Sequence, residues 1–441
     1  MTPRIKLGVV FTSMMLTVML VLGAVMGKSK EGDGAYRPLS VYSEVLAKIK
    51  SDYVEDPNME EVTRGALQGL VEYLDGSSSY LTASQYEEYL KSLKNDDGGT
   101  GLSTGMVVEK RAGYCYVLSV LPDSPADKLG IRTGDLVEAI NGLSTRVMPP
   151  AYLHALLSGP PDSTLSLMLR PNQNTDEPKE LSLKRSKLRL PPVTHKILED
   201  GVGYIDVNAL DEDRVNQVSK AVKSLQSAGA RQIVLDLRGS SVGSPQLGVR
   251  LANLFVDSGK IATLKGQRYP EKVFEADSKS TVTKAELVVI TDRSTAGAAE
   301  IAAAAIMDSG RGEVVGERTY GIAAEQDTVK LEDGAALLIS VAKYYSPSGK
   351  AMQDEGVTPS IPLTPGELRR YRQHLLDSAE DEFGELPAPS TTETTPEPEE
   401  GSAEDPYLKK ALEVLKGQVV KQAARLEIVP PPSELEFAAA A

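Results

Sequence analysis

Strand-like apolar runs alternate with helical segments between Gly201 and Ser309, and this alternation constrains the fold more than any other feature of the chain. It is typical of an α/β domain, in which helices cover both faces of a largely parallel sheet. Ligand sites in such domains lie beyond the carboxyl ends of the strands, at helix N-termini. The expected strands are 202–207, 232–237 and 287–291, and the expected helices are 213–228, 245–255 and 298–309.

Composition limits the number of folded units and the kinds of partner and cofactor that the chain can have. The 441 residues, 41% of them hydrophobic, suffice for two or three folded units, and a net charge of −14 argues against a nucleic-acid partner. The single cysteine, Cys115, allows no intrachain disulfide, and its apolar surroundings predict a buried strand residue. His154, His195 and His374 lie far apart without Cys, Asp or Glu at metal-ligand spacing. We therefore expect neither a metal nor another cofactor.

Residues 98–186 show short strands separated by turns and contain "SPADKLGIRTGDLVEAING", wording that closely resembles a PDZ domain. In such domains a Gly-rich loop binds a C-terminal carboxylate, and the peptide adds a strand to the sheet edge. The resemblance implies Gly99, Gly101 and Leu102 as the peptide-binding loop, and a helix at 151–157 as the other wall of the groove. A loop that merely turns the chain is the alternative. The expected strands are 106–109, 114–120, 136–140 and 165–169.

The region 38–97 has helical periodicity and precedes the PDZ-like segment. Apolar residues recur at helical spacing in its first part, so two amphipathic helices are expected to pack on each other or on a second copy of the chain. A polar loop to Tyr80 and a third helix follow. The expected helices are 39–53, 59–74 and 84–93.

An apolar run of twenty residues, 7–26, follows Arg4 and Lys6 and matches the length of a membrane-spanning helix. The positive flank predicts a cytoplasmic N-terminus and an exported remainder. Residues 1–30 are thus a transmembrane anchor or a signal segment, and a poorly formed cleavage site favours the anchor. The expected location is the inner or plasma membrane, with one pass and the bulk of the chain extracytoplasmic, in the periplasm.

The C-terminal part changes character at residue 377. Residues 377–404 contain no Lys or Arg and are rich in Glu, Pro, Thr and Ser, which predicts an acidic disordered linker. Asp405 followed by Pro406 then predicts the start of a helix, 405–425, with Asp405 as its N-cap.

Four further stretches carry a family resemblance: "ALQGLVEYLDGSSSYL", "IVLDLRG", "VVGERTYG" and "KYYSPSGKAMQDEGVTPSI". They resemble the carboxy-terminal processing proteases, also called tail-specific proteases, over residues 39–361 and again at 405–415. The resemblance implies a multidomain α/β and α+β protein, with a helical N-terminal region, a PDZ domain and a crotonase-like core at 187–365. It also implies peptide-bond hydrolysis by a Ser and Lys pair, in which a neutral Lys accepts the serine proton.

The two catalytic positions implied by the resemblance carry residues without the required chemistry. Alignment on the Glu300-Ile301 pair places the nucleophile at Gly297, and the base position after "GERTYG" is Ile322. Their spacing of 25 residues matches the family. Gly has no side chain to acylate, and Ile has no lone pair to accept a proton.

Three further positions bear on this site. Relatives have a Pro-Gly-Gly turn after "LDLRG" that helps to form the oxyanion hole, whereas this chain has Val242 there. Gln326 matches the glutamine that orients the lysine, although an ordinary strand residue is the simpler interpretation. Ser294 is the fallback nucleophile; it and Thr295 are otherwise turn or capping residues. The next lysine, Lys330, is expected further along a strand.

The sequence thus favours a noncatalytic, membrane-anchored protein that binds C-terminal tails of exported proteins through its PDZ domain, as an adaptor or regulator. The alternative is an active serine-type C-terminal processing endopeptidase with a relocated nucleophile. A third hypothesis is an inactive subunit that pairs with an active homologue, and exclusive self-association as a homo-oligomer would count against it.

Overall fold

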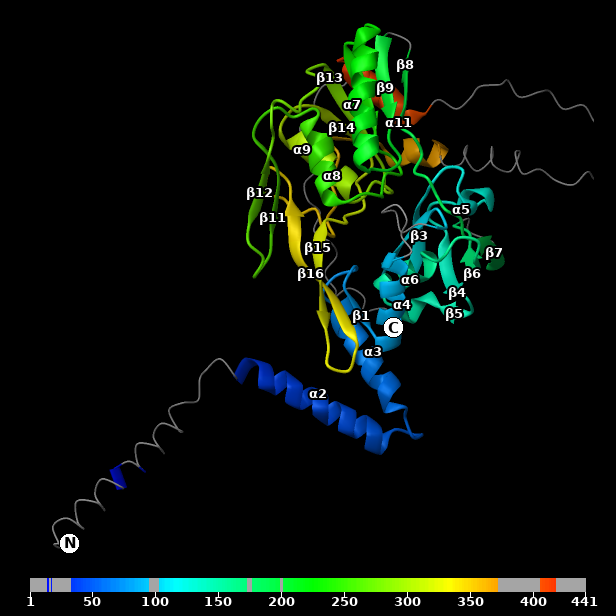
Figure 1. Cartoon of the computed structure of the whole chain (residues 1–441), viewed down its shortest axis with the longest axis vertical. Helices are drawn as coiled ribbons and strands as arrows, with labels where there is room; N and C mark the ends of the chain where they lie inside the picture. Colours follow the sequence, from blue (N-terminus) through cyan, green and yellow to red (C-terminus); the bar gives the residue numbers. More distant parts are fainter. Residues whose placement is uncertain are drawn as a thin grey trace, which may run out of the picture. The chain divides into compact units, whose positions relative to one another are not determined.

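The computed structural model describes residues 33–94, 103–172, 177–198, 201–371 and 405–417, together with Met14, Met15 and Thr17 (Figure 1). The chain divides into two units, Met1–Leu67 and Gln68–Ala441. Most of the predicted anchor, the acidic linker, and the proposed peptide loop of Gly99, Gly101 and Leu102 lie outside the described residues. Within the described part of the chain, no helix combines the length and the apolar character needed to cross a membrane.

The first unit contains helix α2 (Asp33–Asp52), and helix α3 (Met59–Glu72) begins in it. The Asn58 side chain accepts hydrogen bonds from the backbone N–H groups of Glu60 and Glu61, which caps the start of α3. The predicted helices at 39–53 and 59–74 are confirmed in type. Along α2, Leu39, Val41 and Val45 are each at least half exposed. Their predicted packing partner stays a prediction.

The polar loop expected before Tyr80 is in part wrong, because residues Ser79–Leu81 form strand β1. This strand pairs antiparallel with β16 (Ala336–Tyr345), with Tyr80 opposite Leu337. Only three residues are involved, and their partner is more than 250 positions away in the sequence. Local patterning therefore gave no sign of the strand. The third predicted helix is present as α4 (Ala83–Lys94).

The PDZ unit is a sheet with the strand order β2-β3-β4-β6-β7, in which β2 is a free edge strand. Helix α6 (Pro150–Leu157) contacts β2 and closes the core, so the predicted helix at 151–157 is confirmed. Cys115 is a buried strand residue with 2% exposure, as predicted. The other elements are β2 (Met106–Arg111), β3 (Tyr114–Val120), α5 (Pro125–Lys128), β4 (Leu136–Ile140), β5 (Leu143–Ser144), η1 (Thr145–Val147), β6 (Thr164–Arg170) and β7 (Lys179–Lys184).

The α/β core contains the predicted parallel sheet, with the order β17-β14-β13-β10-β9-β8. All neighbouring strands in it are parallel except β8, which runs antiparallel to β9. The predicted helices are α7 (Glu212–Ser227), α8 (Pro245–Asn253) and α9 (Ala298–Asp308). The strands are β8 (Thr194–Ile197), β9 (Val202–Asp206), β10 (Gln232–Asp236), β13 (Glu286–Thr291), β14 (Glu313–Gly316) and β17 (Ile361–Pro362).

Both faces of this sheet are covered, as the alternating pattern predicted. Ile233 and Leu235 pack in one hydrophobic cluster with residues of α7, α8 and α9. Val234 lies on the opposite face, in a cluster with Tyr407 and Ala411 of helix α11 (Pro406–Leu415). Helix α11 contacts β13 and β14 of this sheet. A segment from the end of the chain therefore completes the core.

Helix α11 starts as predicted but ends earlier. The Asp405 side chain accepts hydrogen bonds from the N–H groups of Tyr407 and Leu408, which confirms the N-cap. The predicted extent to residue 425 is wrong, because the helix ends at Leu415. Gly417 follows with φ of 68°, a conformation that terminates many helices and that glycine adopts without strain.

A further sheet, which the sequence did not predict, has the order β1-β16-β11-β12, and β15 also pairs with β16. Its long β15 and β16 strands form an antiparallel hairpin that leads away from the candidate site. The remaining bounds are β11 (Lys260–Lys265), β12 (Lys272–Glu275) and β15 (Ala324–Lys330).

Candidate functional site

Gly297 lies where the chain turns from strand β13 into helix α9. Its φ of 62° and ψ of −119° form a conformation that residues with a side chain rarely adopt. A Cβ placed on Gly297 would have only two atoms nearby, the carbonyl oxygens of Gly243 and Ile322, each 3.9 Å away. The fold therefore brings the two predicted catalytic positions and the loop after "LDLRG" together. The atoms that these two facing segments bring closest to Gly297 are both hydrogen-bond acceptors.

Glu300 ties these segments to one another. Its carboxylate is fully buried and accepts hydrogen bonds from the backbone N–H groups of Gly297 (2.9 Å), Gly321 (2.8 Å) and Ile322 (2.8 Å). The hydroxyl of Thr319 donates a further hydrogen bond to it. One side chain thus fixes the N-terminus of α9 against the segment that carries Ile322.

Burial raises the pKa of the Glu300 carboxyl to about 7, although the hydrogen bonds from Thr319, Ile322, Gly297 and Gly321 act in the opposite direction. Sequence reasoning used Glu300 only to align the site and missed this role. The available signal was a lone acidic residue inside an otherwise apolar, Ala-rich helix, because such a residue needs several donors when it is buried.

Val242 occupies a different place from the one expected. Its side chain packs against Leu121, Leu188, Leu190 and Ala209, and none of its atoms lies within 4 Å of the Cβ position built on Gly297. The contact with that position comes instead from the carbonyl of the next residue. Val242 therefore acts on the site by holding the loop in place, rather than by filling the space above Gly297.

Gln326 lies on β15 and is exposed. Its Nε2 donates a hydrogen bond to the carbonyl oxygen of Ser77, 2.9 Å away, in the turn before β1. The interpretation as an ordinary strand residue therefore describes its contacts. Lys330 ends the same strand, as predicted, and its Nζ lies 5.8 Å from the ring centre of Tyr86.

Ser294 and Thr295 belong to the turn before α9. The Thr295 hydroxyl donates to the Leu237 carbonyl oxygen (2.9 Å) and accepts from the Asp292 N–H (3.0 Å), so it holds the turn against strand β10. The backbone N–H of Ser294 donates to Asp292 Oδ1, and the residue is only 4% exposed. In this conformation the Ser294 hydroxyl is buried away from any peptide.

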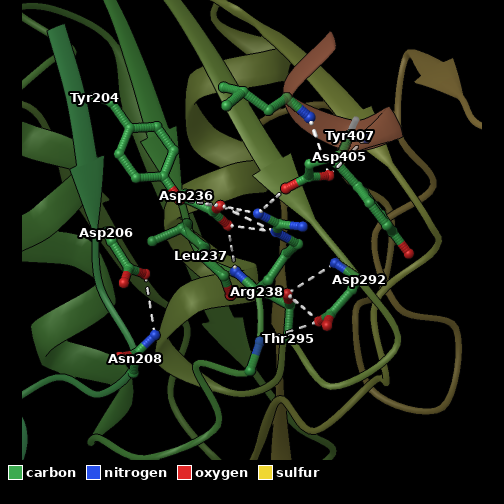
Figure 2. A network of polar contacts seen from close by, with 12 residues as sticks. Tyr204, Asp206, Asn208, Asp236, Leu237, Arg238, Asp292, Thr295, Asp405 and Tyr407 are labelled. Carbon is green, nitrogen blue, oxygen red and sulfur yellow. Dashed lines mark hydrogen bonds and ion pairs between the residues drawn. The ribbon is translucent and has the colours of Figure 1, made fainter. Parts of the chain in front are cut away.

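A polar network at the carboxyl ends of β10 and β13 lies beside this turn (Figure 2). Arg238 forms an ion pair with Asp236 at 2.6 Å and another with Asp405 at 2.8 Å, and its guanidinium lies 4.9 Å from the ring centre of Tyr407. Asp292, whose pKa is raised by burial, accepts a hydrogen bond from the Gly239 N–H. Through the ion pair of Arg238 with Asp405, the N-cap of α11, the network holds this helix against the sheet.

No group of three or more His, Cys, Asp or Glu side chains in the described ranges is arranged to hold a metal ion. His154 lies in the PDZ unit and His195 on β8 of the core. His374 lies outside the described residues.

Two family profiles match the chain: residues 201–363 match peptidase family S41, and residues 116–171 match the PDZ domain. A carboxyl-terminal-processing protease of Picosynechococcus is 32% identical over 66% of this chain and 70% of its own length. The carboxy-terminal processing protease CtpA of Bacillus subtilis is 29% identical, over 75% of this chain and 69% of its own length. The solved structure of a photosystem II D1 C-terminal processing protease superposes with a TM-score of 0.59 at 25% identity and covers 74% of this chain and 93% of its own.

Proposed function

This chain belongs to the carboxy-terminal processing protease family, peptidase family S41, and on that premise we propose that it binds protein C-termini without hydrolysing them. Anchored in a membrane, it would act as an adaptor or regulator for exported proteins. The PDZ domain supports the choice of ligand, because such domains accept C-terminal peptides at a sheet edge.

The observation that carries the proposal is the geometry at Gly297. The strand, the turn and the helix N-terminus of a nucleophile site are all present, yet the position has no hydroxyl. The facing position is Ile322, which cannot accept a proton. From the segments that face the turn, the carbonyl oxygens of Gly243 and Ile322 lie 3.9 Å from the place of the absent Cβ, and neither can donate to a negative charge.

The rest of the site is built to be stable. Glycine at this φ and ψ removes backbone strain that costs about 1–3 kcal/mol for other residues. Glu300 satisfies four donors around the turn. These features support a scaffold whose fold persists although its nucleophile and base are gone.

Membrane attachment and export rest on the sequence. The uncharged run 7–26 has the length of a bilayer core, and its basic flank favours an extracytoplasmic location for the remainder. The membrane anchor would hold the PDZ domain near tails of other exported proteins.

The experiment is a binding and hydrolysis assay on the detergent-solubilised full-length chain, with peptides that end in an apolar residue and a free carboxylate. We expect saturable binding, loss of that binding when the carboxylate is amidated, and no protein-dependent cleavage at saturation. Cleavage that disappears in Ser294→Ala would establish the alternative, an active peptidase with a relocated nucleophile.

A further inference from the structure

Strand β2 is an edge strand of the PDZ sheet; Gly76 lies beside the carbonyl oxygen of Lys110, so the backbone before Lys110 is the part that an added strand could pair with. Val108 of β2 pairs in register with Val117 of β3. The backbone groups of Val117 form their hydrogen bonds on the side away from β2. Its N–H donates to the Asp135 carbonyl and its carbonyl accepts from the Gly134 N–H, each at 2.8 Å. In antiparallel pairing, the backbone groups of Val108 must then point away from β3, toward the free edge.

A side chain of helix α6 now occupies that edge. The Nε2 atom of His154 lies 2.9 Å from the carbonyl oxygen of Val108 and forms a hydrogen bond with it. A tail that pairs with β2 has to supply a backbone N–H at the same carbonyl. His154 is about half exposed, so it can swing away and be replaced without disturbing the core.

Glu109, the next residue, projects to the opposite face of β2 from Val108. It is 9% exposed, and burial raises its pKa. The Nε2 atom of His154 lies 3.8 Å from the Oε1 atom of Glu109, beyond hydrogen-bond distance. The backbone N–H of Lys110 donates to the Glu109 carboxylate, and in the described ranges no side chain does so. A buried carboxylate with so little compensation is costly unless a ligand supplies the partner.

The neighbouring groups do not neutralise this carboxylate. Tyr116, opposite Glu109 on β3, contacts Tyr320 of the core with ring centres 6.1 Å apart. Arg111 lies on the same face of β2, but its guanidinium is stacked 5.4 Å from the Tyr320 ring centre. No Lys or Arg of the described residues lies within ion-pair distance of Glu109. Glu109 is on the edge strand, so an added strand would lie beside it.

We propose that Glu109 makes this PDZ domain select tails with a Lys or Arg at the one position that lies beside Glu109 when the tail pairs with β2. The inference rests on the proposed binding of C-termini. Side chains of directly paired strand residues are about 5 Å apart, within reach of an ion pair. A hydrogen bond to a charged group that is shielded from water outweighs the cost of ordering the Lys or Arg side chain, so the preference should be at least about fivefold.

The test measures the affinity of the full-length chain for labelled ten-residue peptides with an apolar C-terminal residue, in which a single Lys, Ala or Glu is moved through the last six positions. We expect one position at which Lys binds at least about fivefold tighter than Ala and Glu binds more weakly, with no preference at the adjacent positions, whose side chains face the other way. In Glu109→Gln the preference should fall below about twofold.

Glu180→Gln on β7, the opposite edge strand of the same sheet, is the matched control and should keep the preference. Carboxylate-dependent binding without any Lys preference, or a preference unchanged in Glu109→Gln, overturns the inference and leaves the proposed function standing. Absence of carboxylate-dependent binding for every peptide overturns both.

Discussion

Gly297, at the predicted nucleophile position, has a backbone conformation that suits a residue without a side chain. Its positive φ suits glycine, and the space around the absent Cβ is open to 3.9 Å. A serine would therefore fit sterically but would strain the backbone. We infer that the reverse change, from serine to glycine, relieves strain and needs no repacking.

Gly297→Ser should accordingly lower the free energy of unfolding by about 1–3 kcal/mol, the usual cost of a non-glycine residue in such a conformation. Urea unfolding measures the change. Gly366→Ser is the control, because Gly366 has no positive φ and no atom within 4 Å of its added Cβ. Equal stability of Gly297→Ser and wild type would show that the turn relaxes and that no strain is stored.

Glu300 should make stability depend on pH near neutrality. Its pKa is raised from 4.5 to about 7 in the folded chain, so the folded state binds more protons than the unfolded state between these values. Stability from this group is then present below about pH 4.5 and is lost as the pH rises toward 7, by roughly 2–3 kcal/mol.

Urea unfolding of wild type and Glu300→Gln at several pH values between 4.5 and 7.5 tests this dependence. In the variant, the free energy of unfolding should no longer fall between pH 4.5 and 7 through this group. The variant should be less stable at every pH, because an amide cannot accept from all four donors. Glu180→Gln should keep the wild-type slope. An identical slope in Glu300→Gln would place the titration elsewhere.

Two elements are held by contacts that come from distant parts of the chain. Helix α11 covers one face of the parallel sheet and is fixed by the ion pair between Asp405 and Arg238. Helix α6 closes the PDZ core and reaches the edge strand through His154. Each contact can be removed separately.

Asp405→Ala should destabilise the chain by about 2–4 kcal/mol, because it removes both the N-cap of α11 and a partner of the partly buried Arg238. Asp405→Asn keeps an equally good cap and loses only the charge, so it should cost about half as much. Hydrogen exchange of the α11 amides gives the local effect. Equal losses in both variants would mean that the ion pair alone holds the helix.

His154→Ala should strengthen the binding of every C-terminal tail by about twofold to tenfold, because the tail no longer competes for the Val108 carbonyl. Titration with a labelled peptide measures it. His195→Ala, on exposed strand β8 of the core, is the control and should not change affinity. Weaker binding in His154→Ala would instead show that His154 contacts the tail.

At the scale of the whole molecule, the loop after "LDLRG" connects the site to the PDZ unit. Val242 packs with Leu121, and the hydroxyls of Ser241 and Ser119 are 2.5 Å apart. Tyr320, two residues before Ile322, contacts Tyr116 on β3. The orientation of the Gly243 carbonyl therefore depends on contacts between the PDZ unit and the α/β core.

Restoring hydrolysis should for this reason require more than two side chains. Gly297→Ser with Ile322→Lys should give no measurable cleavage of a saturating peptide, whereas the addition of Val242→Gly frees the loop and should give weak cleavage. Single-turnover assays distinguish the two. Full activity in the double variant would show that the loop is already competent.

The sequence by itself determined the α/β and PDZ elements, because their hydrophobic periodicities are local. It also identified Gly297 and Ile322 as the residues at the two catalytic positions that the family resemblance predicts. The tertiary structure decided features that local patterns do not encode. These are the short strand β1 with its distant partner, the four hydrogen bonds to Glu300 and the contact of Gln326 with Ser77. It also decided which backbone groups face the missing side chain and which carboxylate lies at the free PDZ edge. These depend on residues far apart in the chain, which only the packed fold brings together.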